Sequence, residues 1–316
     1  MKKLLAIVVA GISLYQVPIA LASPISITGD IAVKYERDTN DGEQAAAGMI
    51  YTTKLMAETD FGAGWSAYAR LGAQHLTKSG FGDFNPERYG SDDKSVLALD
   101  QFGVKYKVGN LEYKLGRQDV TVGKTALLYS RSDANIGKNT FVDGLMASGT
   151  VGVMEVSAVV VQEDNVGSLD NKVYAIRAGY SPRESLNLGL TLGRYQGPSI
   201  ESTNHMAVDG TYKFGKSSLT AEFAKSNNNS DNKAYATTFN YAFNDKTVAY
   251  ITGFKVEANG DMGGQSDFDN GNQGFHYGVT HSLSAVDSLE VAYAAQKTII
   301  DGLHNNKLEV TLSHGF

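Results

Sequence analysis

Basic side chains recur on the polar faces of segments in which apolar and polar residues alternate. Early segments carry Lys34, Lys54 and Arg70 on that face, and later ones carry Lys105 and Arg177. If these faces enclose water, inward cations lower the self-energy of anions in a narrow, low-dielectric passage. The alternative interpretation is a set of scattered charges offset by nearby carboxylates, namely Asp30, Glu58 and Asp60.

Other groupings of reactive residues are weak. The chain has no Cys, which excludes disulfide scaffolds, thiolate zinc sites and cysteine nucleophiles. A calcium loop counted from Asp267 would need Gly and Glu where Asn272 and Gly278 stand. Ser282 beside His281 fits strand alternation, and no Gly-x-Ser-x-Gly elbow occurs. The sequence therefore predicts no enzyme, no cofactor and no metal.

The first residues have the pattern of an export signal. Lys2 and Lys3 precede an apolar run, and Ala20-Leu-Ala22 offers small residues for cleavage before Ser23. The run is short for a bilayer span, which needs about 20 residues. We expect a Sec signal peptide at 1–22 and one domain at 23–316. Its removal takes the formal net charge from -6 to -8, which argues against nucleic-acid binding.

In the rest of the chain, apolar residues alternate with small or polar residues at every second position. Tyr235, Phe239 and Phe243, for example, share one face, while Ala236 and Asn240 share the other. Such a strand has one apolar face and one small or polar face. The spacing predicts sixteen strands, near 25–36, 48–61, 65–75, 96–108, 111–118, 142–150, 153–163, 172–181, 186–196, 204–214, 217–225, 233–244, 246–257, 273–284, 287–299 and 307–316.

The connections between these strands alternate between short turns and longer loops. Lipid cannot hydrogen-bond the backbone, so only a closed barrel leaves no unpaired strand edge in a membrane. Even strand number, short turns on one rim and long loops on the other are typical of outer-membrane barrels. A soluble propeller would show a recurring four-strand repeat, and none is found. We expect an all-β, sixteen-stranded antiparallel transmembrane β-barrel with short periplasmic turns and long external loops.

Several motifs resemble those of the sixteen-stranded Gram-negative porins of the general diffusion type. Thr52-Thr-Lys-Leu-Met-Ala-Glu-Thr-Asp-Phe-Gly-Ala-Gly-Trp65 is similar to the family's second strand and Gly-rich turn. Asp100-Gln-Phe-Gly-Val-Lys-Tyr106 and Gly116-Arg117-Gln118 are similar to its fourth and fifth strands. The terminal Phe316, which closes an alternating apolar strand, resembles the signal read by the barrel-assembly machinery. Outside these motifs the chain matches the family only in the spacing of its expected strands.

The resemblance implies that the third loop, 119–141, folds into the barrel and narrows the pore. The family's best-studied members carry acids on that loop. Here Asp133 is the only acid between Val120 and Phe141, and Lys124, Arg131 and Lys138 lie beside it. We assign the pore constriction to this loop and to inward wall cations, and we expect a weak anion preference. The assigned residues are Lys34, Lys54, Arg70, Lys105, Arg117, Lys124, Arg131 and Asp133.

The position of Arg117 in its strand allows two orientations of its side chain. Strict alternation places it with Tyr113 and Leu115 on the lipid face, where Arg costs about 2–4 kcal/mol at mid-bilayer. A bulge at Gly116 would re-aim the side chain inward, and otherwise the strand ends there at the polar rim. The resemblance favours the inward orientation.

These observations predict an outer-membrane porin, a water-filled channel for passive diffusion of small hydrophilic solutes and ions. The alternatives are a substrate-specific channel for a sugar or anion and, less favoured, a surface adhesin or envelope-anchoring barrel. The resemblance also implies a homotrimer in outer-membrane lipid, latched by the aromatic loop 76–95. It further implies recognition by the assembly machinery through Phe316.

Overall fold

The computed structural model describes residues 23–78, 94–137, 139–165, 169–198 and 201–316, so the expected leader at 1–22 lies outside it. Within these ranges every regular element is a strand, and no helix is present that could cross a membrane. The strands are β1 (Ser26–Asn40), β2 (Ala46–Gly62), β3 (Trp65–Leu76), β4 (Ser95–Val108), β5 (Leu111–Gln118), β6 (Val120–Val122), β7 (Tyr129–Arg131), β8 (Val142–Val151), β9 (Met154–Glu163), β10 (Lys172–Arg183), β11 (Leu186–Gln196), β12 (Thr203–Phe214), β13 (Ser217–Ser226), β14 (Lys233–Asn244), β15 (Thr247–Val256), β16 (Asn272–Ser282), β17 (Asp287–Thr298) and β18 (His304–Gly315).

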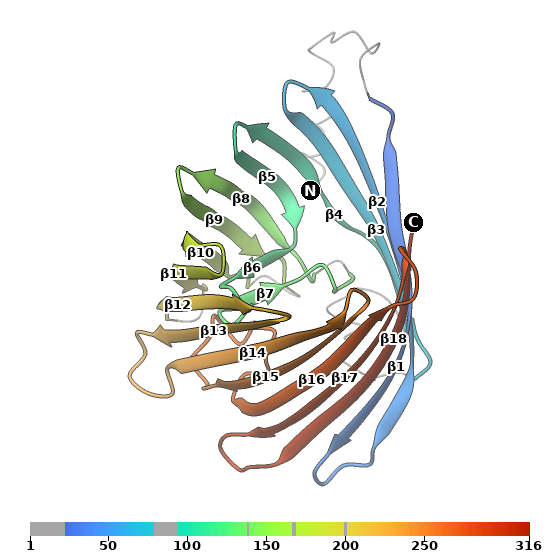
Figure 1. Cartoon of the computed structure of the whole chain (residues 1–316), viewed down its shortest axis with the longest axis vertical. Helices are drawn as coiled ribbons and strands as arrows, with labels where there is room; N and C mark the ends of the chain where they lie inside the picture. The colour runs from blue at the N-terminus through green and yellow to red at the C-terminus, as the bar shows by residue number, and fades with distance from the viewer. Residues whose placement is uncertain (1–22, 79–93, 138, 166–168, 199–200) are drawn as a thin grey trace.

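Sixteen of these strands form one closed antiparallel barrel (Figure 1). Each pairs with its neighbour along the chain, except that β5 pairs with β8 and β18 returns to β1. The sixteen expected strands and their closure are therefore confirmed. The remaining two, β6 and β7, form a separate hairpin inside the barrel and were not predicted.

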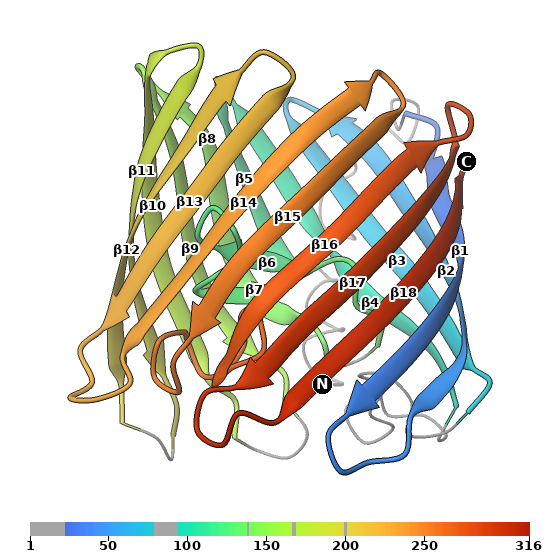
Figure 2. The same cartoon turned by 60° about the horizontal axis from the view of Figure 1, so that its bottom comes forward.

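The two rims of the barrel differ in the length of their connections. Two residues join β2 to β3, β4 to β5 and β12 to β13 at one rim, while 119–141 and 257–271 leave from the other. Figure 2 shows the tight turns together at one end and the long connections at the opposite end. The start of β1 and the end of β18 both lie at the turn rim, as alternating connection lengths require.

Side chains alternate between the outer face and the lumen. On β14, Tyr235 and Phe239 are exposed on the outside, whereas Ala234 and Ala236 are fully buried inside. Aromatic rings gather on the outer face near the turn rim, where Trp65 stacks on Tyr106 with ring centroids 4.5 Å apart. An apolar exterior with aromatic residues near a rim is what lipid contact selects in a membrane barrel.

The last residue completes the seam between the first and last strands. The backbone N–H of Phe316 donates to the carbonyl of Gly29 at 3.0 Å, and the N–H of Gly29 donates back to Phe316 at 3.0 Å. Gly29 is required here because a Cβ would lie 2.4 Å from the carbonyl oxygen of Lys54 and 2.8 Å from the Phe316 ring. The seam between β1 and β18 therefore ends on the contact between Gly29 and Phe316.

Deletion of Phe316 should lower the amount of folded barrel in the outer membrane and leave exported protein in the periplasm. The deletion removes both closing hydrogen bonds and the terminal aromatic ring. Cell fractionation with heat-modifiability on gels would measure the effect, with Phe316→Tyr as the conservative control. Normal outer-membrane levels of the deletion variant would contradict this expectation.

Candidate pore constriction

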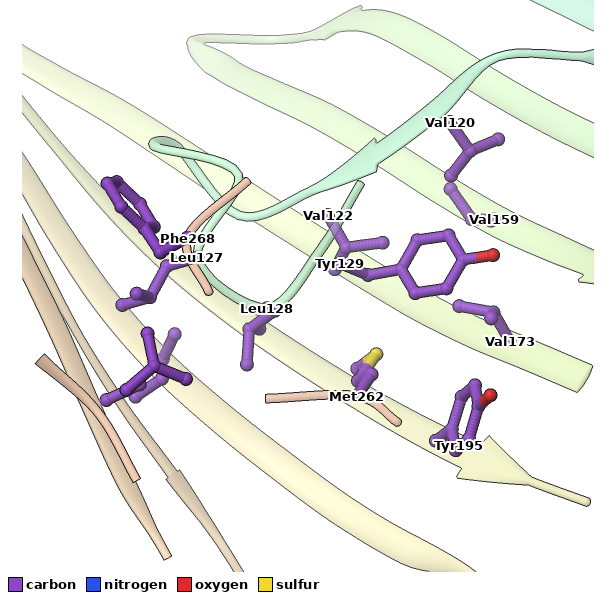
Figure 3. Packing of buried hydrophobic residues seen from close by; sticks show 14 of the residues in the cluster. Val120, Val122, Leu127, Leu128, Tyr129, Val159, Val173, Tyr195, Met262 and Phe268 are labelled. Atoms are coloured by element: carbon purple, nitrogen blue, oxygen red, sulfur yellow. The ribbon is translucent and has the colours of Figure 1, made fainter. Parts of the chain in front are cut away.

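Loop 119–141 lies inside the barrel, where its apolar side chains pack on the inner wall (Figure 3). Leu127, Leu128 and Tyr129 are fully buried. They belong to one cluster with wall residues such as Val159 and Val173. The expectation of an inward-folded third loop is therefore confirmed, and the β6–β7 hairpin gives this loop its rigid form.

A buried ion pair fixes one end of the hairpin to the wall. The guanidinium of Arg131 lies 3.3 Å from the carboxylate of Glu163 at the end of β9, and both side chains are almost fully buried. The same carboxylate accepts hydrogen bonds from the hydroxyls of Tyr129 and Tyr195. It also accepts from the side-chain amide of Asn171 at 2.8 Å. A buried charge with this many partners is a stable anchor, because its lost hydration is replaced.

A second ion pair holds the middle of the loop. Arg70 forms a bidentate pair with Asp100, at 2.8 and 3.0 Å, and also donates to the backbone carbonyls of Asp133 and Asn135. The N–H of Gly137 donates to the same carboxylate at 3.2 Å. Arg70 therefore connects strand β3, strand β4 and the loop.

A bulge in β4 makes this second anchor possible. The β3–β4 register shifts at Asp100, so that Asp100 and Gln101 are both buried. The flanking Leu99 and Phe102 both remain exposed on the outside. Strict alternation would have sent one of the two polar side chains into the exterior face.

A second loop, 257–271, also folds inward and covers the hairpin. The N–H of Met262 donates to Leu128 O at 2.8 Å, and the N–H of Asp267 donates to Ala126 O at 3.2 Å. The side chains of Met262 and Phe268 join the buried cluster, and the Phe268 ring stacks on Phe254 of β15. The side chains of Asp267 and Asp269 in this loop remain exposed, whereas Met262 and Phe268 are buried.

One buried carboxylate, that of Asp261, organises this second loop. Asp261 accepts from the N–H groups of Gly264 and Ser266, both at 3.2 Å, and from the side-chain amide of Asn270 at 2.7 Å. Burial raises the pKa of Asp261, and these donors partly oppose the rise. Among the described residues, no group of His, Asp and Glu is placed to hold a metal ion.

An open space of about 740 Å³ remains between the two loops and the facing wall. Its wall side is formed largely by polar residues, among them Thr220, Thr238, Asn240, Tyr250, Thr252 and His276. Its charged lining consists of Lys34 and Lys124 against the carboxylates of Glu36, Asp267 and Glu309. The lining therefore carries no surplus of cations.

Comparison with known proteins was informative only at the level of structure. No protein-family model matches the chain, and no curated protein matches its sequence. A multiply substituted Rhodopseudomonas blastica porin superposes with a TM-score of 0.61 at 12% identity, over 92% of this chain and 100% of that chain. A further variant of that porin gives a TM-score of 0.60 at 13% identity, with the same coverage. The chain has the porin fold.

A second organism contributes a similar barrel. OmpT, described as an outer membrane protein of Vibrio cholerae, matches in a form lacking loop L8 with a TM-score of 0.59. Identity is 11%, over 93% of this chain and 100% of that chain. Because identity is low in every case, this similarity establishes the porin architecture for the chain and leaves its solutes and partners open.

Within the porin fold, the predicted constriction residues separate into distinct groups. Lys34 and Lys124 line the open space. Arg70 and Arg131 are instead buried in the two loop anchors, and Asp133 contributes its backbone carbonyl to the anchor formed by Arg70 and Asp100. Two of the seven cations expected at the neck, Arg70 and Arg131, therefore hold the loop in place and are not available to ions in the water.

The other predicted wall lysines are paired away from the open space. The amine of Lys105 lies 2.7 Å from Glu58, close to the turn rim. The amine of Lys54 lies 3.8 Å from Asp30. These pairs agree with the alternative interpretation, in which lumen charges are scattered and offset by neighbouring carboxylates.

Arg117 faces the outside of this porin-type barrel. It pairs across the strands with Phe102 and Asp143, and the register runs through Gly116 without a shift on both sides. Its guanidinium lies 2.7 Å from Asp143 and 2.5 Å from Asp164. The inward orientation suggested by the resemblance, and the bulge at Gly116, are wrong, because the bulge of this region is in β4.

Two lumen carboxylates were missed by the sequence reasoning. Glu36 and Glu309 stand directly opposite each other on β1 and β18, and the amine of Lys34 bridges them at 2.9 and 2.5 Å. Glu36 lies two residues after Lys34 in the same strand, so the alternation of faces already placed both side chains on the lumen side. Counting the acidic residues on that side would have found Glu36. Only the closure of β1 on β18, however, brings Glu309 beside them.

Proposed function

We propose that this porin-type barrel is a water-filled channel of the outer membrane, through which small hydrophilic solutes and ions diffuse down their gradients. One observation carries the proposal, namely an open, mostly polar space of about 740 Å³ inside a closed barrel with an apolar exterior. The neighbours described above are named as porins and an outer membrane protein. An adhesin or anchor would not need an open space with a polar lining beside an anchored loop.

The neck should favour cations weakly or show no preference. The anion preference expected from the sequence placed six cations at the neck, namely Lys34, Lys54, Arg70, Arg117, Lys124 and Arg131. Three of them, Arg70, Arg117 and Arg131, do not face the water. Fixed charges within about one Debye length, ~8 Å at physiological salt, decide selectivity at a narrow section. There the described lining offers two lysines against three carboxylates.

We further propose that the subunits associate as trimers through the outer face near β5 and β8. Arg117, Asp143 and Asp164 form a charged cluster on that face, and contact with lipid would make such a cluster costly. A second copy would cover it. The expected latch, loop 76–95, lies almost wholly outside the described residues. Light scattering of gently extracted protein at the monomer mass would contradict the trimer.

Reconstitution tests the channel proposal directly. Planar bilayers containing the purified protein should show steady single-channel currents, and liposomes should admit small sugars at rates that rise linearly with concentration. Protein-free bilayers and heat-denatured protein are the controls. Saturation or block by one solute would support the substrate-specific alternative, and absence of current and flux from folded protein would refute the proposal.

A further inference from the structure

The connection between β6 and β7, residues 123–128, forms the tip of the inward hairpin and meets the barrel wall at Glu222 of β13. The backbone N–H of Thr125 donates to the Glu222 carboxylate at 2.7 Å, and the Thr125 hydroxyl donates to it at 2.8 Å. Gly123 passes so close that a Cβ there would lie 2.4 Å from the same carboxylate. Besides its two ion-pair anchors, the loop therefore has a third fixed point at the hairpin tip.

The backbone of the tip needs such a contact. Gly123 has a φ of +96° and Ala126 has a φ of +59°, a region that residues with a Cβ seldom adopt. Such a conformation persists only where the surrounding structure holds it. Glu222 holds Thr125, and the N–H of Asp267 donates to the carbonyl of Ala126 at 3.2 Å. The course of residues 123–126 is therefore set by contacts from outside the hairpin.

Glu222 itself destabilises the wall in which it stands. It is 2% exposed, and its Oε1 has no hydrogen-bond partner among the described residues. Asp209 of β12 lies directly opposite, and like charges in that position destabilise a sheet. The guanidinium of Arg177 is bidentate to Asp209, at 2.6 and 3.0 Å. Within the described ranges, the hydrogen bonds that Glu222 accepts all come from the hairpin tip, so its use must be sought there.

The tip carries Lys124, whose side chain lines the open space together with Lys34. The amine of Lys34 bridges Glu36 and Glu309. Lys124 differs, because its amine has no ion pair in the part of the chain that the structure describes. The backbone N–H of Lys124 also faces the Glu222 carboxylate. The lining lysine whose charge is not offset by a bound carboxylate therefore depends on Glu222 for its position.

We propose that Glu222 is a positioning residue for ion selectivity, which holds the tip so that the Lys124 amine stays in the open space. The inference rests on the proposed function, because it requires ions to pass through that space. Glu222 does not line the space itself, so it acts on ions through the lysine. A charge held at a narrow section lies within a Debye length, ~8 Å at physiological salt, of every passing ion. A charge on a loose tip is instead averaged over the lumen.

Reversal potentials of the full-length protein in planar bilayers, measured in a KCl gradient, test this role. Glu222→Ala should shift the potential toward cations and raise the cation-to-anion permeability ratio about twofold to fourfold, because Lys124 is no longer held. Glu222→Gln should stay near wild type, since its amide oxygen can accept from both donors of Thr125. If the carboxylate acted by its own charge, both variants would shift the potential toward anions instead.

A double-mutant cycle isolates the route through the lysine. Lys124→Gln alone should reproduce the shift of Glu222→Ala, and the combined variant should shift no further. Thr220→Val is the matched control, because Thr220 lies on the same strand and lines the open space but bonds to Thr211 and not to the hairpin tip. Glu222→Ala also removes the repulsion by Asp209, so heat-modifiability on gels should show as much folded barrel as in wild type.

Three outcomes would overturn the proposal. They are a Glu222→Gln shift as large as that of Glu222→Ala, additive shifts in the combined variant, and wild-type selectivity in folded Glu222→Ala. If Glu222→Ala did not fold, Thr125→Ala, which removes the hydroxyl donor, should give a smaller shift toward cations that Lys124→Gln abolishes, and its absence would overturn the proposal too. Absence of current from folded wild type would refute the channel, whereas wild-type selectivity in a conducting Glu222→Ala variant would refute the positioning role alone.

Discussion

Replacing Arg70 with alanine should destabilise the barrel by about 3–5 kcal/mol and make its current noisy, because Asp100 would keep a buried charge without its cation. The substitution also removes both hydrogen bonds that hold the carbonyls of Asp133 and Asn135. The loop should then move within the lumen. Urea unfolding in detergent would measure the first effect and single-channel recording the second.

Two variants separate these effects. Replacing Arg70 and Asp100 together with alanine should recover much of the stability, since no unpaired charge remains, while the current stays noisy. Lys105→Ala is the matched control, because Lys105 is also a lumen cation paired with a carboxylate but does not touch the loop. A partly exposed pair of this kind contributes about 0–1 kcal/mol. Wild-type stability and quiet currents in Arg70→Ala would show that Arg70 does not anchor the loop.

Replacing Lys34 with methionine should shift the zero-current potential in a salt gradient strongly toward cations. The substitution leaves Glu36 and Glu309 opposite each other in the open lining without the amine that bridges them. One unit charge about 4 Å from an ion's path is worth about 1 kcal/mol in water, so the cation-to-anion permeability ratio should rise roughly threefold to tenfold. The shift should shrink as salt concentration rises.

Lys54→Met is the matched control for this shift. Lys54 lies on the neighbouring strand and pairs with Asp30, but it does not line the open space. Its substitution should change the reversal potential much less, and neutralising the outward Arg117 should leave it unchanged. If Lys34→Met behaved like these two variants, the narrowest section would have to lie elsewhere in the lumen.

The strands could be predicted from the sequence because each strand meets two uniform environments. Tyr235 and Phe239 face outward while Ala234 and Ala236 face the packed lumen, so the two-residue period survives along the whole segment. Which rim carries the long loops and which the tight turns follows from the lengths of the connections between strands. These features depend on local pattern, and every strand of the wall was therefore found.

The constriction could be predicted only in part, because its geometry depends on contacts between distant residues. Strands of three residues, such as Val120–Val122 and Tyr129–Arg131, are too short to show a period. The alternation of faces along β3 placed Arg70 correctly in the lumen. It could not indicate that a bulge at Asp100 in β4 would bury the Arg70 side chain in an ion pair. Nothing in the acid content of 257–271 indicates that its Met262 and Phe268 would pack in one buried cluster with the hairpin.

The seam between β1 and β18 also determines when the protein can fold. Lys34 and Glu309 touch across it although 275 positions separate them in the chain. Hairpins such as β14–β15 can form from local contacts, but closure must wait for the last strand and is expected to be the slow step. Until then both β1 and its growing partner sheet expose unpaired backbone edges, which invite aggregation. Both edges therefore need protection until β18 has paired with β1, and the folding time is expected to depend on that last strand.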